Sequence, residues 1–405
     1  MQAPEQALQA FDIVIVGGGL AGNCLGLALV DSGLRIAIIE ANTREHLLNS
    51  AMGDRALALA AGTVETLEEL GVWHGIQAKA TAITDIHVSD RGHFGKVRLS
   101  ARKQNVAALG YVITARDIES HVATMVDNTD ITQICPARVV GLMSDENEVN
   151  VSVKHQEDSL CLTAKLLVGA DGGNSSVRKL LDIAQQVSEY GQTALVTTVK
   201  TTLPHHNTAY ERFTESGPLA LLPSGKNHCS VVWTRSNEDA DALMMGNEAD
   251  FLAELQQCFG YRLGQLALTA PRRAFPVSLI RADQMHSGRT VIIGNAAHQL
   301  HPVAGQGFNL GLRDVSQLAE MILKQHKNGA DIGAATFLND YVVARKRDHS
   351  LTIGFTDTLV RLFSNDWPVL AAARNIGLAA FDHLPLAKTL LSRHAMGLTQ
   401  RQNPS

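Results

Sequence analysis

The segment from Gly294 to Asn309 has a high density of residues that could do chemistry. It places His298 and His301 among four glycine or proline residues, between an expected strand and an expected helix. Gly305 and Gly307 would expose consecutive backbone N–H groups at the start of that helix, where the positive end of the helix dipole stabilises an anion. The His-x-x-His spacing is found in zinc sites, but an HExxH glutamate and a later ligand are missing. The segment therefore predicts an anion-binding loop and no metal.

A second glycine-rich turn lies early in the sequence. Gly17, Gly19 and Gly22 follow the GxGxxG pattern between an expected strand and an expected helix. The first glycine permits a tight turn, the second lets a pyrophosphate approach the backbone, and the third lets the helix pack on the strand. Glu40 ends the next expected strand, where a carboxylate would bind a ribose 2′-OH and repel a 2′-phosphate. The turn predicts a dinucleotide site that suits FAD or NAD better than NADP.

The segment from Asp171 to Arg178 also follows an expected strand. Its Asp-Gly-Gly-x-Ser-x-x-Arg pattern indicates a turn and a helix cap, because Asp and Asn side chains hydrogen-bond to nearby backbone. On its own residues, this structural interpretation is favoured over a binding role.

These three segments require strands that bring them to one edge of a sheet. Residues 11–16 are a nearly continuous apolar run, typical of a buried parallel strand. A helix over 23–32, ending at Gly33, and a strand over 34–39 would complete a βαβ unit. Further strands are expected over 76–106, 162–170 and 290–295, and helices over 55–71, 114–126, from about 308 and within 350–400.

Residues 185–275 have a different character. Short β-rich pieces are interrupted there by Pro204, Pro218 and Pro223, which predicts an antiparallel sheet in a second domain. The sequence thus predicts an α/β nucleotide-binding domain whose insertions form a substrate domain. The expected boundaries are 1–75, 107–184 and 276–345 for the nucleotide domain, 76–106 and 185–275 for the substrate domain, and 346–405 for a C-terminal helical region.

The composition narrows the class of protein. Of the 405 residues, 45% are hydrophobic and 19% are charged, which is typical of a globular chain with ample apolar surface to bury. The net charge of −5 disfavours a general nucleic-acid binder, because that function needs a cationic surface. Five cysteines without a CxxC pair favour reduced thiols. Without a signal-peptide pattern or a long apolar stretch, we expect a cytoplasmic protein.

In their order and content, the three motifs resemble those of the group A FAD-dependent aromatic monooxygenases. They correspond to the GxGxxG, DG and GD fingerprints of that p-hydroxybenzoate hydroxylase-like superfamily, at 17–22, at 171–178 and from 294. The resemblance implies a Rossmann-like FAD-binding domain of p-hydroxybenzoate hydroxylase type, with an inserted antiparallel β-sheet and a C-terminal helical tail. Residues 301–314 resemble the narrower signature of the ubiquinone-biosynthesis hydroxylases.

The resemblance also implies which residues bind the cofactor. Glu40 would hold the adenosine ribose, Arg116 would lie near the pyrophosphate, and Asp171 would have a structural role and one toward NAD(P)H. Asn295 departs from the Asp usual in the superfamily, but its amide can still accept from and donate to the ribityl hydroxyls of the flavin. The cofactor-binding candidates are Gly17, Gly19, Gly22, Glu40, Arg55, Arg116, Asp171, Gly294, Asn295, Gly305, Gln306, Gly307 and Asn309.

Three residues are candidates for a direct part in catalysis. Arg55 would lie beside the flavin, and Pro302 would present its backbone over it. His301 is the third candidate, although for both His298 and His301 a supporting place in the loop structure is favoured over a catalytic role.

Within the ubiquinone group, residues 81–93, 211–223 and 352–363 resemble enzymes that hydroxylate 2-polyprenyl-6-methoxyphenol. This resemblance implies that NADPH or NADH reduces FAD and that O₂ forms a flavin C4a-hydroperoxide. The phenol would then be hydroxylated to 2-polyprenyl-6-methoxy-1,4-benzoquinol. The alternatives are a hydroxylase acting at another ring position or on a soluble aromatic, and a non-catalytic partner-binding protein of the same fold. The loop over 301–309 argues against the non-catalytic alternative, because a partner-binding protein would not need a loop at the edge of a flavin.

A prenylated substrate would have to be taken from a membrane. The implied partners are this phenol, O₂ and other ubiquinone-biosynthesis proteins. Apolar faces near the C-terminus are more typical of helix packing than of membrane contact, and they are formed by Leu359, Val360, Leu362, Phe363, Trp367, Val369 and Leu370. Peripheral membrane association, or docking on a biosynthetic complex, is a hypothesis that concerns residues past about 365.

Overall fold

The first sheet is built around five parallel strands in a computed structural model that describes residues 9–91 and 95–363. β1 (Gln9–Val16) pairs with β2 (Ile36–Ile39) and with β11 (Asp158–Gly169), and β8 (Thr132–Ile134) and β19 (Thr290–Ile292) extend the sheet. The spatial order is β18-β19-β11-β1-β2-β8. Antiparallel strands complete it: β9 (Ala137–Ser144), β10 (Val149–His155) and β18 (His286–Ser287). The sheet therefore joins three separated parts of the sequence, as predicted.

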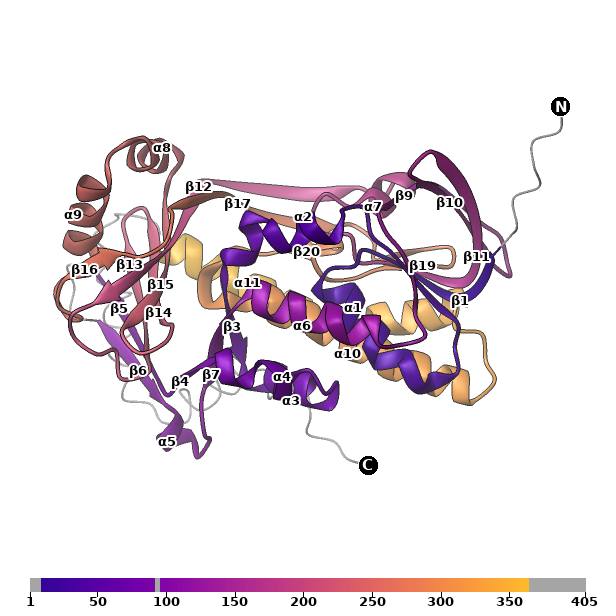
Figure 1. Ribbon diagram of the computed structural model, residues 1–405, viewed down its shortest axis with the longest axis horizontal. Helices are drawn as coiled ribbons and strands as arrows, with labels where there is room; N and C mark the ends of the chain where they lie inside the picture. Colours follow the sequence, from indigo (N-terminus) through magenta and orange to yellow (C-terminus); the bar gives the residue numbers. More distant parts are fainter. Residues whose placement is uncertain (1–8, 92–94, 364–405) are drawn as a thin grey trace.

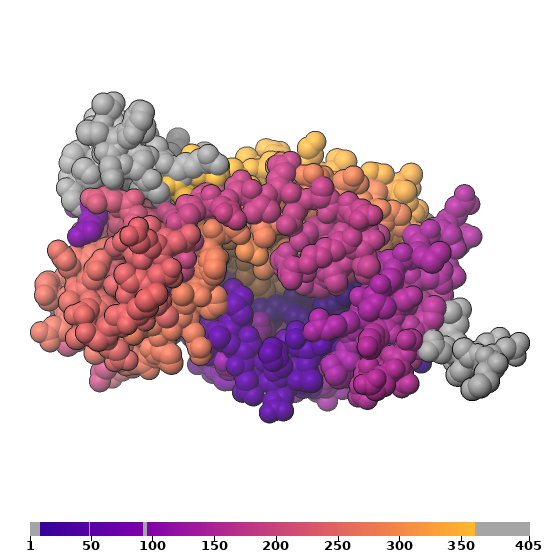
Figure 2. Space-filling model, turned by 90° about the horizontal axis from the view of Figure 1, so that it is seen from above, coloured from indigo at the N-terminus to yellow at the C-terminus, as the bar shows by residue number. Residues whose placement is uncertain are grey.

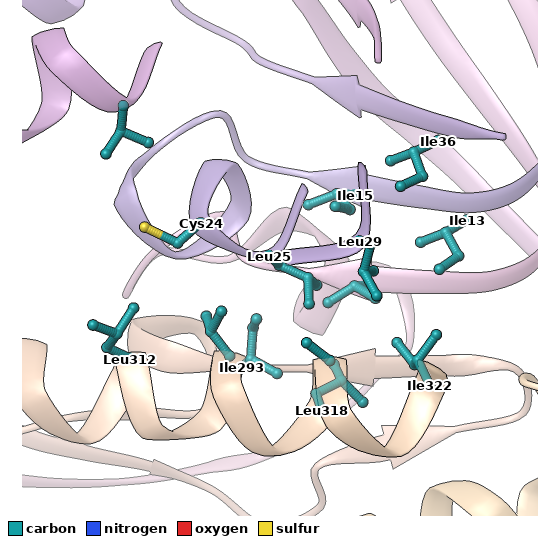
Figure 3. Packing of buried hydrophobic residues seen from close by; sticks show 14 of the residues in the cluster. Ile13, Ile15, Cys24, Leu25, Leu29, Ile36, Ile293, Leu312, Leu318 and Ile322 are labelled. Carbon is teal, nitrogen blue, oxygen red and sulfur yellow. The ribbon is translucent and has the colours of Figure 1, made fainter. Parts of the chain in front are cut away.

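Helices cover this sheet and share a core with it (Figure 1). They are α1 (Leu20–Leu29), α6 (Ala115–Asp127), α10 (Gln306–Lys327) and α11 (Ala335–Phe363). Figure 3 shows Leu25 and Leu29 of α1 lying between the strand residue Ile13 and the α10 residues Leu318 and Ile322. All five side chains are fully buried. The motif-bearing turns thus begin from strands held in a continuous apolar core.

The second sheet lies at the other end of the molecule and is mostly antiparallel (Figure 1). Its spatial order is β20-β17-β12-β15-β14-β13-β5-β6, with β16 beside β12, and β13 and β5 pair in parallel. Its strands are β5 (Asp85–Asp90), β6 (Lys96–Ser100), β12 (Gln185–Thr201), β13 (Thr208–Thr214), β14 (Gly217–Pro223), β15 (His228–Ser236), β16 (Leu266–Leu268), β17 (Arg273–Ala282) and β20 (His298–Gln299).

Helices α8 (Asn237–Met245) and α9 (Glu248–Phe259) pack on one face of the second sheet. Trp233 of β15 stacks edge-on against Phe251 of α9, with 5.6 Å between ring centroids. The sequence interpretation expected only strands over 185–275 and missed both helices.

A small third sheet corrects one prediction. The expected helix over 55–71 is wrong in its first part, because β3 (Ala56–Ala60) is a strand and only α3 (Ala61–Glu69) is helical. β3 pairs antiparallel with β7 (Gly110–Thr114), which also pairs with β4 (Thr81–Ile83). The helix propensity of the alternating Ala and Leu residues is overridden by this pairing.

The remaining elements are short, and the C-terminal helix is long. α2 (Arg44–Asn49), α4 (Trp73–Ile76), α5 (Ala101–Gln104) and α7 (Ser176–Leu180) connect the strands, with 3₁₀ turns at Val30–Ser32, Ala51–Asp54, Gln77–Lys79, Gly294–Ala296 and Val303–Gly305. α11 runs without interruption past residue 346, where the sequence analysis expected a boundary. No helix in the described part of the chain is long and apolar enough to cross a membrane.

Candidate functional site

A cavity of about 1490 Å³ is lined by residues of all three sheets. In Figure 2 the surface is hollowed between the indigo N-terminal segments and the orange and magenta segments that face them. The volume exceeds that of ordinary pockets for a single small molecule, roughly 300–1,000 Å³, so the cavity has room for a dinucleotide and a second ligand. Gly22 and Arg116 do not line it, and the other predicted site residues do: Gly17, Gly19, Glu40, Arg55, Asp171, Gly294, Asn295, His301, Pro302, Gly305, Gln306, Gly307 and Asn309.

The glycine turn has the geometry that its spacing predicts. Gly17 has φ +111°, and a Cβ there would lie 2.4 Å from the Ala170 carbonyl oxygen. A Cβ on Gly22 would lie 1.9 Å from the Gly17 carbonyl oxygen, so Gly22 lets α1 pack against the turn without reaching the cavity. A Cβ on Gly19 would meet only open space. Because no side chain caps the first turn of α1 and no acidic residue lies in it, its N–H groups are available to an anion.

Glu40 closes this end of the cavity. One carboxylate oxygen, Oε2, accepts from the Gly18 N–H at 2.8 Å, and Oε1 accepts from the Asn42 N–H at 2.7 Å and from its side-chain amide at 3.1 Å. An ionised carboxylate has about four acceptor positions, so Glu40 keeps capacity for a ribose hydroxyl.

The loop before α10 also lines the cavity. Gly305 has φ +60°, and a Cβ there would lie 2.9 Å from the Cβ of Ala58 in β3. Asn309 ties the loop down: its amide donates to the carbonyls of Ala58 and Gly305, and its Oδ1 accepts from the Ala60 N–H at 2.9 Å. As in α1, no side chain caps the first turn of α10. Both uncapped helix starts therefore face one cavity.

Asp171 acts as the helix cap that the sequence suggested. Its Oδ2 accepts from Ser176 N and Oγ at 2.6 and 2.8 Å and from Val177 N at 3.1 Å. Its Oδ1 is buried without a hydrogen-bond partner among the described residues. Asn295 follows shortly after the end of β19, and its exposed side chain also lines the cavity. A buried acceptor without a partner indicates that a ligand completes this part of the site.

The two predicted arginines differ in position. Arg116 donates to Asp54 at 2.6 Å and to the Ser50 carbonyl at 3.0 Å, and this contact keeps it out of the cavity lining. Arg55 does line the cavity, with its guanidinium 5.9 Å from the centre of the Phe275 ring. Burial lowers the pKa of Arg55, and the charge of nearby Glu119 opposes this effect.

His301 is a neutral hydrogen-bond donor in the cavity wall. Its side chain is 1% exposed, and burial lowers its pKa to about 4. Because Nδ1 accepts from the Val303 N–H at 3.0 Å, the ring proton of the neutral form lies on Nε2. Nε2 is buried and has no partner among the described residues. His301 therefore offers an unused N–H donor to whatever fills the cavity.

His298 has a structural role and does not face the ligand site. It belongs to a buried polar cluster that the sequence analysis did not predict. Its Nε2 donates to Asp314 Oδ2 at 2.7 Å, and Asp314 Oδ1 accepts from His349 Nε2 at 2.6 Å and from Arg345 Nε at 2.7 Å. Asp314 also accepts from the Gly294 N–H at 3.2 Å. Burial acts to raise the pKa of Asp314, but the neighbouring His349, His298 and Arg345 hold it well below its usual range.

The same cluster contains the residue types of a metal site. Ligand atoms of His298, Asp314 and His349 all lie within 4.8 Å of one another. However, the buried Arg345 guanidinium already donates to Asp314 and provides the local positive charge. We therefore assign the cluster a structural role: it attaches the loop after Gly294 to α10 and α11. Asp314 follows His298 by 16 residues and His349 follows Asp314 by 35, so only the packing of the helices reveals this role.

The second sheet supplies an apolar wall for the other half of the cavity. Along a strand, alternate side chains point to the same face. Ile86 and Val88 of β5, Ala220 and Leu222 of β14 and Val232 of β15 line the cavity in this way. Phe355 and Leu359 of α11 also line it. This half therefore suits an apolar ligand.

Comparison with known proteins places the chain in a family. Residues 10–347 match the family described as FAD binding domain. The chain is similar to ubiquinone hydroxylase UbiL of Rhodospirillum rubrum, with 36% identity over 392 residues that cover 95% of this chain and 89% of the relative. It is 30% identical to 3-demethoxyubiquinol 3-hydroxylase of Escherichia coli over 392 residues, 96% of this chain and 99% of that one.

The chain belongs to the ubiquinone hydroxylase family of FAD-dependent monooxygenases. The fold agrees with this assignment: p-nitrophenol 4-monooxygenase PnpA from Pseudomonas putida DLL-E4 superposes with a TM-score of 0.80 at 18% identity, covering 98% of this chain and 100% of that one. The predicted p-hydroxybenzoate hydroxylase type of fold, FAD as cofactor and aromatic-ring monooxygenase chemistry are thereby confirmed.

The cavity of this family member suits FAD. Two helix starts without side-chain caps face it, Gly19 leaves open space beside one of them, and Asp171 and His301 present buried polar atoms without partners among the described residues. Each feature is one that a dinucleotide with a polar ring system would complete.

Replacing Glu40 tests the nucleotide end. We expect Glu40→Gln to weaken FAD binding about tenfold, because a neutral amide accepts hydrogen bonds less strongly than a carboxylate. The dissociation constant is measured by fluorescence titration of the apoprotein with FAD. Glu45→Gln, at an exposed position of α2, is the control and should bind FAD like the wild type. Equal affinities for all three proteins would contradict the assigned position of the ribose.

The pH dependence of stability tests whether His301 is buried in its neutral form. Its folded pKa of about 4 lies below its unfolded value, so stability is complete above about pH 6.5 and is lost as the pH falls toward 4. Between about pH 7.5 and 5, the free energy of unfolding of the wild type should fall because unfolded His301 takes up a proton. His301→Asn, which keeps an acceptor for Val303, should make this fall about 2 kcal/mol smaller. Urea unfolding at both pH values measures it, with His74→Asn, at an exposed position, as the control. An unchanged decrease in His301→Asn would show that the ring is accessible to protons.

Proposed function

We propose that this protein hydroxylates 2-polyprenyl-6-methoxyphenol para to its hydroxyl group, forming 2-polyprenyl-6-methoxy-1,4-benzoquinol. NADPH or NADH and O₂ would be the co-substrates. The observation that carries the proposal is the continuity of the cavity: it extends from the glycine turn, which suits a dinucleotide, to an apolar face of the second sheet. Such a face suits a ring with an apolar tail and no charged substituent.

The two ligands are assigned to the two regions of the chain. FAD would lie in the region formed by 1–75, 107–184 and 276–345, with its ribose at Glu40 and its ring system against the loop from Pro302 to Asn309. The phenol would lie against strands from 76–106 and 185–275. Phe355 and Leu359 of α11 would also contact one of the two ligands, since both line the cavity.

When bound, FAD supplies the capacity to take two electrons from NAD(P)H and to activate O₂. The residues of the chain would bind and orient the two ligands and exclude water. The uncapped starts of α1 and α10 would stabilise negative charge on the pyrophosphate and at the edge of the ring system, respectively. The Nε2–H of His301 would donate to a ligand oxygen. The apolar wall would exclude water and hold the phenol ring in place.

The overall reaction balances with these components. One atom of O₂ forms the new C–O bond of the ring, and the other leaves as water. NAD(P)H gives two electrons as a hydride, one further proton is taken up, and the ring proton is replaced by a hydroxyl group.

The membrane hypothesis concerns apolar residues near the end of α11 and beyond it. Within the described residues, Val360 is 2% exposed and packs with Phe213 and Val303, so it serves helix packing and not a membrane surface. Trp367 and the other residues past about 365 that the hypothesis concerned lie outside the described residues. The proposed partners are thus the prenylated phenol, O₂ and enzymes of the same pathway.

Product analysis tests the proposed reaction. FAD-loaded protein is incubated with NADPH, ¹⁸O₂ and a short-chain 2-prenyl-6-methoxyphenol, and the product is analysed by mass and by ring position. We expect one labelled oxygen para to the phenol hydroxyl. A label at another ring position would favour a reaction like that named for the Escherichia coli relative. NADPH oxidation that yields only peroxide would contradict this substrate.

A further inference from the structure

A smaller cavity lies at the outer edge of the second sheet, where β6 is the last strand. Figure 1 shows β5 and β6 at the end of the molecule that is opposite the first sheet. This cavity has a volume of about 300 Å³, and Ile86 and Leu99 separate it from the large cavity, because they line both. Its charged lining residues in the described part of the chain are Asp85, Arg98 and Arg262. The proposed reaction makes no use of this cavity, so its charges call for an explanation of their own.

The strand register gathers basic side chains on one face of this edge. Arg98 on β6 lies directly opposite His87 on β5, which lies directly opposite Tyr210 on β13. In the next row on the same face, Lys96 of β6 and Arg212 of β13 flank β5. Because alternate side chains of a strand point to the same face, all five share the face that turns away from the large cavity.

Arg262 reaches this face from the loop after α9, and its contacts there are not with acidic groups. Its guanidinium lies 5.7 Å from the centre of the Tyr210 ring and donates to Nδ1 of His87. Among the described residues, no acidic side chain forms an ion pair with Arg262. A guanidinium carries five N–H donors in a rigid fork, so these two contacts orient it and leave donors unused.

The surroundings of His87 show that this face is strongly positive. His87 is 7% exposed, and burial, followed by the charges of four cations, lowers its pKa to about 4. These cations are Arg262, Arg98, Lys96 and Arg212. The ring is therefore neutral near pH 7, and because Nδ1 accepts from Arg262, its proton lies on Nε2. Asp85 is the acidic residue among the described lining residues, so cations outnumber acids at this edge.

A phosphate group is complementary to this cavity in charge and in size. It carries at least one negative charge near neutral pH, and a guanidinium fork can bind two of its oxygens at once. A volume of about 300 Å³ lies at the lower limit of ordinary ligand pockets and suits a small polar group. We infer that this cavity is a second ligand site, in which Arg262 binds a phosphate group. Arg98 has a further interaction of its own, so the site depends mainly on Arg262.

Two sources could present the phosphate group: a free phosphorylated molecule, or the headgroup of an anionic phospholipid. Tyr261, next to Arg262, is 71% exposed, and Leu203 is 50% exposed. A hydrogen bond of 3.0 Å from the Leu203 N–H to the Leu263 carbonyl brings these two segments together. Exposed apolar side chains beside basic ones are typical of contact with a lipid surface, so both sources need a test.

Calorimetry with inorganic phosphate tests the site. The protein is loaded with FAD, which occupies the dinucleotide region, and is titrated with sodium phosphate while sodium chloride keeps the ionic strength constant. The wild type should bind phosphate saturably at one site. Arg262→Ala should weaken this binding roughly 10–100-fold, as expected for hydrogen bonds to a charged group. Arg262→Lys should give an intermediate affinity, because it keeps the charge and loses the fork.

A matched control comes from α11. Arg347 is exposed there and lines neither cavity, so Arg347→Ala should bind phosphate like the wild type. Lys96→Gln is a second variant at the site and should weaken binding by a smaller factor, because one nearby charge is lost. FAD absorbance shows that each variant is folded and loaded.

Vesicles distinguish the two sources of the phosphate group. Cosedimentation compares vesicles of phosphatidylglycerol and phosphatidylcholine with vesicles of phosphatidylcholine alone. Retention on phosphatidylglycerol that is lost in Arg262→Ala and in excess inorganic phosphate would support the site and identify a lipid headgroup. Phosphate binding without such retention would support the site and identify a free phosphorylated molecule. Equal phosphate affinities of the wild type and loaded Arg262→Ala, or a wild type that binds neither phosphate nor phosphatidylglycerol, would overturn the inference.

Discussion

A buried carboxylate, Asp314, holds the cavity-facing loop to the two long C-terminal helices. It accepts hydrogen bonds from the Gly294 N–H, His298, His349 and Arg345, and both of its oxygens are fully buried. A buried charge is costly unless it is paired, and removing a single partner would leave the others uncompensated. The conformation of the loop is therefore coupled to the packing of α10 against α11, and through Asn309 to β3. In the proposed arrangement, the positions of both ligands depend on that loop.

The two halves of the cavity follow from two different properties of β-strands: the common direction of parallel strands and the alternation of side chains along a strand. In the first sheet, parallel strands end at one edge, so β1 and β19 bring the glycine turn and the Gly294 loop together although they lie far apart in sequence. In the second sheet, alternation along antiparallel strands turns one face toward the cavity, while the other face packs on α8 and α9. Polar contacts gather in the first half and apolar ones in the second, which is the division that a dinucleotide and a prenylated ring require.

Local patterns predicted much of this site, and non-local contacts account for what they missed. Gly17 and Gly305 were identifiable because positive φ and close backbone contacts leave a signature within a few residues. The strand at 56–60 was missed because its pairing with β7 is a tertiary property. The partners of Asp314 depend on the packing of α10 against α11, so residue spacing could not reveal them. Arg116 lies outside the cavity because Asp54 binds it there, a contact that no motif encodes.

The central claim is that one cavity holds FAD against the Pro302–Asn309 loop and a phenol ring between that FAD and the β13–β14 wall. An experimental structure of the FAD-loaded protein with a short-chain 2-prenyl-6-methoxyphenol tests it most directly. We predict that the adenosine ribose lies at Glu40 and that the phenol ring packs against the β13–β14 wall. A phenol bound outside this cavity, or away from the β13–β14 wall, would contradict the account.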